Sequence, residues 1–253
     1  MNLSGILHEK LSADGNRTGV LWRKVMEKVP RSFIVNRYCA LWRFALVQPV
    51  LVTAGSTRNP IDAMRHIAAF SSGKTGTRIA ELLVNSGCDV HLLGSPQACL
   101  RASDALSVEG FSSTRDLMDR MASYLAQNPT AWVVHCAAVG DYEADPSPKK
   151  IPSGQAELTI HLRQAPKIID HIKKWAPDSC LVGFKAAGPG TTAEELVALC
   201  RALGFRCKAN WVFGNVIGEI ETTATLVDRH GAESFSNRET AFSLLCARIS
   251  AKI

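Results

Sequence analysis

The chain has 253 residues, 46% of them hydrophobic, which is enough for one sizeable α/β domain with a full core. It contains no apolar run of about 18 residues, so we expect no membrane span and no membrane partner. Its eight cysteines are scattered without a CxxC pair, which favours reduced thiols in a cytoplasmic protein over a zinc site or a disulfide framework.

The net charge of +6 is concentrated near the amino terminus. Residues 1–48 hold eight lysines and arginines against three acidic residues, whereas the remainder is nearly neutral. A nucleic-acid-binding protein would be basic more uniformly, so we expect no nucleic-acid partner. Aromatic residues alternate with the charges in 1–48, and Val29-Pro30 interrupts the helical pattern. We predict a basic helical extension, with a nucleic-acid arm and a targeting peptide as alternatives.

From residue 50 onwards, short apolar runs alternate with amphipathic helical patterns. Predicted strands span 50–52, 89–94, 132–136, 180–184 and 211–213, with an exposed strand at 157–162 and a hairpin joining 224–227 to 233–235. Predicted helices span 77–85, 114–127, 166–175 and 238–250, and a further helix is capped by Thr191 or Thr192 and ends before Gly204.

This alternation predicts a doubly wound, mainly parallel, Rossmann-like α/β sheet with a C-terminal hairpin. In such sheets the ligand binds beyond the carboxyl ends of the strands. Gly55, Ala137, Phe184 and Asn215 each follow or end an apolar run. We therefore expect these four residues to line one crevice.

The stretch from Thr53 to Gly76 organises the predicted site. Small residues at 53–57 follow the first strand, and the glycine-rich turn at 71–76 precedes the first helix. Free N–H groups and the positive dipole end of a helix attract phosphate, so the pattern predicts a nucleotide or phosphate site. A Walker A loop would need glycine at position 68, where the chain has Ala68, and the dinucleotide fingerprint GxGxxG is absent.

Six short motifs follow one another along the chain. They are TAGSTRNPID at 53–62, SSGKTG at 71–76, AAVGDY at 137–142, KKI at 149–151, GF at 183–184 and GN at 214–215. In this order they resemble the motifs of the phosphopantothenoylcysteine synthetase family, also called phosphopantothenate–cysteine ligases. The resemblance runs from about residue 50 to the carboxyl terminus, so we predict a ligase-like domain of the stand-alone type over 49–253.

The resemblance implies a two-step ligation in coenzyme A biosynthesis. A nucleoside triphosphate, ATP or CTP, acts with Mg²⁺ to activate the carboxylate of 4′-phosphopantothenate as an acyl-nucleotidylate, releasing pyrophosphate. The amine of cysteine then displaces the nucleotide and forms the amide. The resemblance also implies a homodimer.

Roles carry over position by position. By resemblance, Lys150 activates the carboxylate, and Arg65 and Ala138 contact phosphopantothenate, while no residue is assigned to the metal. Arg206 and Lys208 are the nearest candidates for lysines that contact the triphosphate in some members. Positions that match nucleotide contacts are Gly55, Ser56, Ser72, Gly73, Gly76, Ala137, Asp141, Pro166, Lys167, Ile168, Ile169, Phe184 and Asn215.

The chain also departs from the family pattern. A family asparagine that supports use of the acyl intermediate falls on Ala69, whose side chain cannot donate a hydrogen bond, and a strand-end glutamate falls on Ala187. Asn59 replaces an acid, and Pro152-Ser153 replace the second half of a KIKK motif. These departures keep open a nucleotide- or pantothenate-derivative-binding homologue with altered chemistry. A Rossmann-type oxidoreductase is a further alternative. His66 and His135 lie near the predicted site, as structural or catalytic residues.

Overall fold

The computed structural model describes residues 48–253, and the predicted basic extension lies outside the described residues. The strands of the main sheet are β1 (Val50–Ala54), β4 (Val90–Gly94), β5 (Ser107–Gly110), β6 (Trp132–His135), β9 (Cys180–Ala187), β10 (Trp211–Val216), β11 (Ala224–Val227) and β12 (Ala232–Phe235). Their order across the sheet is β12-β11-β10-β9-β6-β1-β4-β5. The strands from β5 to β10 pair in parallel, and β11 and β12 form the predicted antiparallel hairpin.

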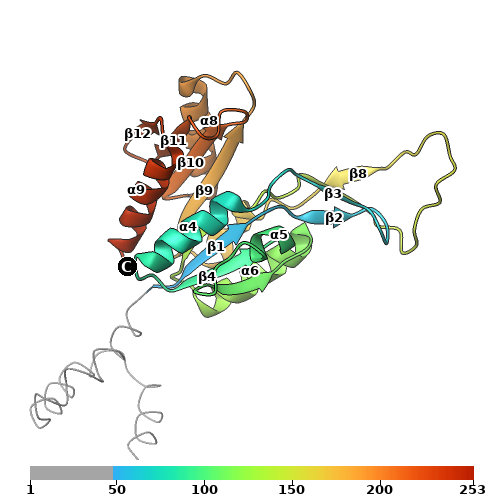
Figure 1. Ribbon diagram of the computed structural model, residues 1–253, viewed down its shortest axis with the longest axis horizontal. Helices are drawn as coiled ribbons and strands as arrows, with labels where there is room; N and C mark the ends of the chain where they lie inside the picture. The colour runs from blue at the N-terminus through green and yellow to red at the C-terminus, as the bar shows by residue number, and fades with distance from the viewer. Residues whose placement is uncertain (1–47) are drawn as a thin grey trace, which may run out of the picture. The chain divides into compact units, whose positions relative to one another are not determined.

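Helices cover both faces of this sheet, because parallel strands bury both faces and their side chains are apolar on each. On one face, α4 (Lys74–Asn85) and α9 (Arg238–Ser250) pack on the core that contains Val52, Val134 and Phe213. On the other face, α6 (Thr114–Gln127) and α7 (Ile169–Trp175) pack on the core that contains Leu51 and Val133, with α8 (Ala193–Cys207) beside them (Figure 1). The predicted doubly wound α/β class is thus confirmed.

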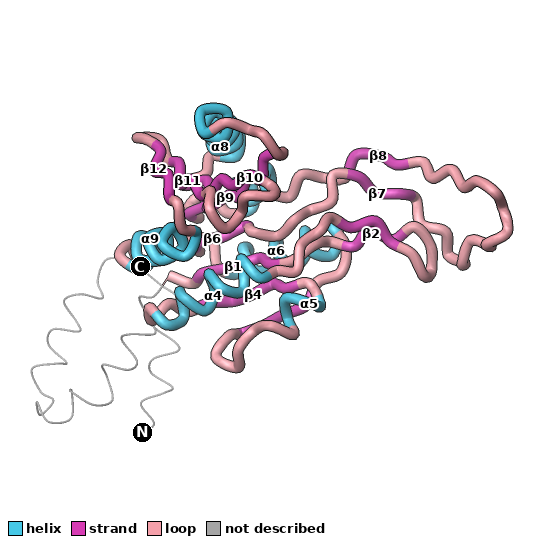
Figure 2. The backbone as a smooth tube through the Cα atoms, turned by 45° about the horizontal axis from the view of Figure 1, so that its top comes forward, coloured by secondary structure: helices cyan, strands magenta, loops and turns pink. Residues whose placement is uncertain are grey.

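Two small antiparallel sheets form an arm beyond the main sheet. They pair β2 (Arg58–Pro60) with β3 (His66–Ala68) and β7 (Tyr142–Ala144) with β8 (Leu162–Gln164). Both views show the arm projecting on one side of the sheet (Figure 1, Figure 2). The predicted strand over 157–162 is therefore wrong except at Leu162, since β8 has only the three residues of β7 to pair with.

Several helices begin at side-chain caps, and the cap predicted at Thr191 or Thr192 is confirmed at Thr192. The side chain of Ser113 caps α6, that of Asn237 caps α9, and Thr192 forms a full capping box with Glu195 at the start of α8. Gly87, which follows α4, has the left-handed φ of 85° that suits a glycine beyond a helix end.

Other helix ends differ from the prediction. α4 begins at Lys74 rather than at Thr77, because Gly73 is its N-cap. α7 begins at Ile169 rather than at Pro166, because the preceding Ala165 N–H continues the arm pairing by donating to the Asp141 carbonyl. α8 does not end before Gly204 but runs to Cys207. A Cβ on Gly204 would lie 3.3 Å from Val212 Cγ2, so the glycine lets α8 pack close to β10 instead of ending it.

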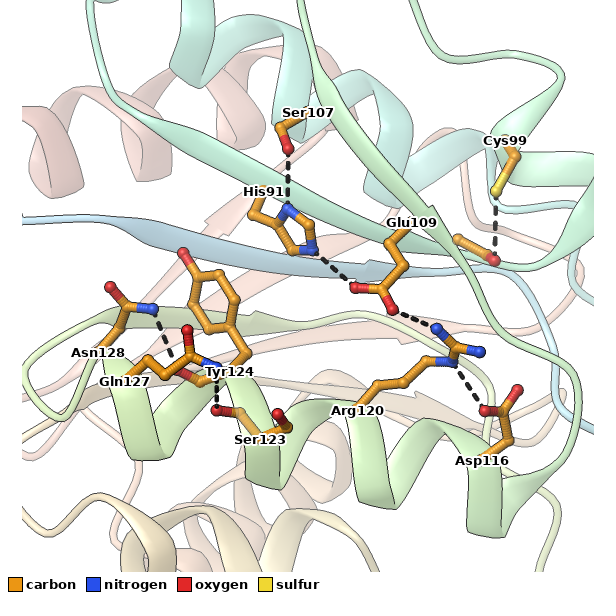
Figure 3. A network of polar contacts seen from close by, with 11 residues as sticks. His91, Cys99, Ser107, Glu109, Asp116, Arg120, Ser123, Tyr124, Gln127 and Asn128 are labelled. Atoms are coloured by element: carbon orange, nitrogen blue, oxygen red, sulfur yellow. Dashed lines mark hydrogen bonds and ion pairs between the residues drawn. The ribbon is translucent and has the colours of Figure 1, made fainter.

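A polar network joins β4, β5 and α6 at the β5 edge of the sheet (Figure 3). His91 lies 3.3 Å from Glu109, and Glu109 also pairs with Arg120 of α6. Arg120 pairs in turn with Asp116 at 2.7 Å, and Tyr124 stacks on the His91 ring with 5.0 Å between centroids. These contacts are with neighbouring elements of the fold, which indicates a structural role.

Two further findings concern membrane spans and cysteines. None of the helices among residues 48–253 is long and apolar enough to cross a membrane. The seven cysteines in this part of the chain are free thiols, as the scattered spacing predicted.

Candidate functional site

Three of the predicted glycines meet at the end of β1. Gly55 and Gly73 have left-handed φ angles of 90° and 81°, which favour glycine. A Cβ on Gly73 would lie 2.5 Å from Ala98 Cβ and 3.2 Å from the Gly55 nitrogen, and a Cβ on Gly76 would lie 2.6 Å from Ala54 Cβ. The sequence therefore allows the turn after β1, helix α4 and the start of α5 (Pro96–Cys99) to contact one another through their backbones.

The amino terminus of α4 offers hydrogen-bond donors at this place. Gly73 provides no side-chain cap, and within residues 48–253 the N–H groups of Lys74, Thr75 and Gly76 donate to no protein acceptor. A helix of 12 residues also presents a positive dipole end here. Ser72 is exposed just before it. These donors suit the oxygen atoms of a phosphate group.

A cavity of about 300 Å³ runs along the first turns of α4, and both basic and acidic side chains line it. Arg238, at the start of α9, donates to Thr75 Oγ1 at 2.6 Å and lies over the Phe242 ring, 5.1 Å from its centroid. Lys74 also lines the cavity. Lys74 and Arg238 therefore place two cations at the first turn of α4, beside the free N–H groups, which favours an anion there.

The predicted alanines Ala137 and Ala138 lie beside the turn after β1, because β6 is the parallel neighbour of β1. Ser56 bridges to Ala138, and the Ala138 N–H donates to the Gly55 carbonyl at 2.8 Å. The Ala137 N–H donates to Thr53 Oγ1 at 3.1 Å. Both alanine N–H groups are thus used inside the protein, so these residues can contact a ligand through their methyl groups and carbonyls but not as donors.

His135 is buried directly before this turn, and its ring is held by Thr53. Thr53 Oγ1 lies 3.0 Å from His135 Nδ1. Because this hydroxyl accepts from Ala137, we assign its proton to the bond with Nδ1, which places the ring proton on Nε2. Burial lowers the pKa of His135 to about 4. The ring is therefore a neutral, positioned group, whereas His66 is exposed in β3. The half-buried Cys136 follows His135.

A second group of predicted residues gathers at the start of α7. Asp141 and Lys167 form an ion pair, and Pro166 lies half-buried beside them. Ile168 is 1% exposed and belongs to the core, so only its backbone can face a ligand. Ile169 is half-buried and lies next to Gly183 of β9.

Phe184 and Asn215 lie inside strands rather than after them. β9 and β10 continue in parallel pairing to Ala187 and Val216, and Phe184 stacks on Phe213 with 5.2 Å between ring centroids. Phe184 packs on the core beneath α4 and α9, whereas Ala137 packs on the opposite core. We expected one crevice lined by all four strand-end side chains, and this expectation is wrong. Phe184 and Ala137 share the carboxyl edge of the sheet, but their side chains lie on opposite faces.

Lys150 and Arg65 are brought close together in the arm. Lys150 is exposed in the loop between β7 and β8. Arg65 Nη2 donates at 2.6 Å to the carbonyl of Ile151, the residue that follows Lys150. Asp62 joins this arrangement, since its carboxylate lies 3.3 Å from Arg65 Nε and accepts from the Ile151 N–H. Asp62 stands in the motif at 53–62, but no site role was predicted for it. An aspartate in a turn after Pro60, where it can bond backbone groups two and three residues ahead, is the signal that was available.

The remaining predicted positions are placed as follows. Ala69 is exposed between β3 and α4, and Ala187 is buried at the end of β9. Arg206 pairs with Asp170 of α7 at 3.3 Å, and Lys208 forms the C-cap of α8. No three His, Cys, Asp or Glu side chains gather as a metal-binding group in the part of the chain that the structure describes.

A doubly wound sheet with a glycine-lined helix terminus at the carboxyl end of its strands defines a Rossmann-like, ligand-binding α/β domain. Residues 47–241 match the family model described as the DNA/pantothenate metabolism flavoprotein C-terminal domain. The chain belongs to this family, and the predicted resemblance to the phosphopantothenoylcysteine synthetases is confirmed.

Curated relatives share the domain but are longer. The chain is 35% identical over 189 residues to the coenzyme A biosynthesis bifunctional protein CoaBC of Thermococcus kodakarensis, covering 73% of this chain and 46% of that protein. It is 31% identical over 195 residues to CoaBC of Mycobacterium tuberculosis, covering 74% and 46%. The chain thus spans about half the length of the curated relatives it matches.

Solved structures share the fold. The DNA/pantothenate metabolism flavoprotein from Streptococcus pneumoniae superposes with a TM-score of 0.74 at 26% identity, covering 82% of this chain and 100% of that chain. A Cab2 variant in complex with phosphopantothenate-cysteine superposes with a TM-score of 0.70 at 17% identity, covering 87% and 90%. The second likeness is one of fold alone.

Proposed function

We propose that this chain ligates cysteine to 4′-phosphopantothenate in coenzyme A biosynthesis, through an acyl-nucleotidylate. The observation that carries the proposal is the amino terminus of α4, where the N–H groups of Lys74, Thr75 and Gly76 find no acceptor in residues 48–253. Relatives named for coenzyme A biosynthesis match the same domain, which supports this substrate class.

The triphosphate binds at the amino terminus of α4, where Lys74 and Arg238 line the neighbouring cavity. The free N–H groups and the Arg238 guanidinium take the phosphate oxygens. Mg²⁺ would accompany the triphosphate and would neutralise part of its charge.

In the first step, the carboxylate of phosphopantothenate attacks the α-phosphorus. A new P–O bond forms, the bond to the β-phosphate oxygen breaks, and pyrophosphate leaves with the electron pair. Lys150 is the cation for the charge that develops, and Arg65 binds the anionic substrate. Both side chains are carried by segments bound to Ile151, which supports their acting together.

In the second step, the amine of cysteine attacks the acyl carbon. The C–N bond forms, the C–O bond to the nucleotide breaks, and the nucleoside monophosphate leaves while the amine proton passes to solvent. The N–H groups of Ala137 and Ala138 are already bonded within the protein, so they do not stabilise the oxyanion. Because Ala69 supplies no side-chain donor either, we propose that this step is the slower one.

The nucleotide is ATP or CTP, and the working species is a homodimer in the cytoplasm. Large apolar side chains on the arm support the dimer, since soluble monomers rarely expose such groups together. Those that are exposed include Met64, Phe70, Tyr142, Leu158 and Leu162.

A second candidate is a homologue that binds the nucleotide or a pantothenate derivative with altered chemistry. Alanine at 69 and 187, where the family uses asparagine and glutamate, favours this candidate. Family membership argues against the Rossmann-type oxidoreductase.

A pyrophosphate-release assay separates the two candidates. The wild type is incubated with phosphopantothenate and ATP or CTP, with and without cysteine. The ligase is expected to release pyrophosphate with one of the two triphosphates. Lys150→Ala should reduce release at least about 100-fold. Lys149→Ala, at the neighbouring exposed lysine, is the control and should stay within about threefold of the wild type. Binding of both ligands without pyrophosphate release would favour the second candidate.

A further inference from the structure

Asp62 lies in the turn between β2 and β3 with its carboxylate turned inward. The residue is 5% exposed. Oδ1 accepts from the N–H groups of Met64 and Arg65, each at 2.8 Å. Oδ2 accepts from the Ile151 N–H at 3.0 Å and lies 3.3 Å from Arg65 Nε. One carboxylate therefore fixes its own turn and a residue 89 positions away along the chain.

The same turn holds Ile151 from its other side. Arg65 Nη2 donates to the Ile151 carbonyl at 2.6 Å, so both backbone polar groups of Ile151 are bound by the turn. A second contact lies four residues earlier, where the Ser147 N–H donates to the Ile61 carbonyl at 2.9 Å. Lys150 lies between these two attachment points.

The loop that carries Lys150 has little else to hold it. Residues 145–161 form no helix or strand, and most are exposed. An extended loop of this length would leave a lysine free to sample many positions, at an entropic cost to any reaction that needs it in one place. The turn around Asp62 supplies the missing restraint.

Charge strengthens the attachment. The Ile151 N–H, followed by the Met64 N–H, holds the pKa of the Asp62 carboxyl below its ordinary value, even though burial opposes this. The group is ionised at neutral pH, and hydrogen bonds to an ionised acceptor are roughly twice as strong as neutral ones. An amide in the same place would lose the charge and one acceptor atom.

We propose that Asp62 is a positioning residue that attaches the loop at Ile151 and so places Lys150 for the first step; this inference rests on the proposed function. It assigns no chemical step to Asp62. Removing its charge should lower the rate of carboxylate activation while leaving the binding of the triphosphate unchanged.

The attachment is tested first without any reaction. Trypsin cleaves after lysine, and the bond from Lys150 to Ile151 is the one that the turn protects. Asp62→Asn should be cut there at least tenfold faster than the wild type. Asp145→Asn is the matched control, since the Asp145 side chain is 82% exposed in the same arm and pairs with Arg163 at the base of the loop rather than with Ile151. This control should be cut at the wild-type rate.

Amide exchange in the wild type keeps the test valid if Asp62→Asn does not fold. The Ile151 amide should exchange at least tenfold more slowly than the Gly154 amide, which donates to no acceptor in the described part of the chain. Equal exchange of the two amides, or equal trypsin cleavage of Asp62→Asn and the wild type, would overturn the attachment.

The role in the reaction is tested by pyrophosphate release. Asp62→Asn should lower kcat at least tenfold with the KM for the triphosphate within about twofold, a split that a general loss of structure would not give. Unchanged kcat in a variant whose loop is cut faster would overturn the positioning role. If the wild type releases no pyrophosphate at all, the proposed function fails and the positioning role fails with it. The exchange measurement would still report on the attachment.

Discussion

Protonation of His135 should make the folded state less stable in mild acid. The ring is buried beside Thr53, and burial lowers its pKa to about 4, whereas a histidine in an unfolded chain titrates near 6.5. Between these two values the unfolded chain binds a proton that the folded chain does not. Stability is therefore complete above about pH 6.5 and falls as the pH falls towards 4.

The size of this effect follows from the two pKa values. One proton of difference costs about 1.4 kcal/mol per pH unit. Over the partly titrated range from pH 7 to pH 5, the free energy of unfolding should fall by about 2 kcal/mol on account of His135 alone. Most carboxyl groups keep their charge over this range, so His135 should account for much of the observed change.

Urea unfolding at pH 7 and pH 5, followed by tryptophan fluorescence, measures the effect. Trp132 and Trp211 stack in the core with 5.4 Å between ring centroids, so their emission should report loss of the core packing. His135→Gln keeps an acceptor for Thr53 but cannot take up a proton, and should lose the pH dependence whatever its absolute stability. His66→Asn, at an exposed histidine, should keep it.

The comparison between variants decides the result. If His135→Gln loses as much stability as the wild type between pH 7 and pH 5, the pH dependence belongs to other groups. The neutral ring assigned to His135 would then be wrong. If the loss of stability between pH 7 and pH 5 disappears in His66→Asn, the pH dependence belongs to the exposed His66 instead.

Three further predictions concern the backbone and the altered loop. Gly73→Ala should lower the free energy of unfolding by at least about 2 kcal/mol in a urea titration, because φ is 81° and the new Cβ would lie 2.5 Å from Ala98 Cβ. Gly154→Ala is the control and should change this free energy little, because there is open space around Gly154. Thr192→Ala should cost about 1 kcal/mol through loss of the capping box, measured as a lower melting temperature. Ala69→Asn should speed amide formation at least about tenfold in a single-turnover quench at saturating cysteine, and an unchanged second step would show that another group supplies the missing donor.

The sequence predicted the sheet well because its central strands are buried on both faces. Runs such as Val50-Leu51-Val52 contain nothing but apolar residues, which is typical of parallel strands covered by helices on each side. Caps such as Ser113 and Asn237 were predictable for a related reason, since each bonds a backbone group within its own first helical turn.

Features set by distant partners could not be predicted in this way. The lengths of β9 and β10 depend on their pairing with each other, which carries Phe184 and Asn215 into the strands. The short β8 likewise depends on the three residues of β7. The contact of Asp62 with Ile151 joins residues 89 positions apart, and no local pattern encodes it.

The position of Cys136 has a consequence for thiol chemistry at the carboxyl edge of the sheet. It follows β6 directly, next to Ala137, and burial raises the pKa of its thiol to about 12. At neutral pH the group is therefore the protonated thiol, whereas the thiolate is the species that attacks a disulfide. Under the proposed function, free cysteine and traces of its disulfide arrive at this edge continually. A protonated thiol resists attacking that disulfide, an exchange that would leave a mixed disulfide on Cys136 and release one free cysteine, so the site is protected from being blocked in this way.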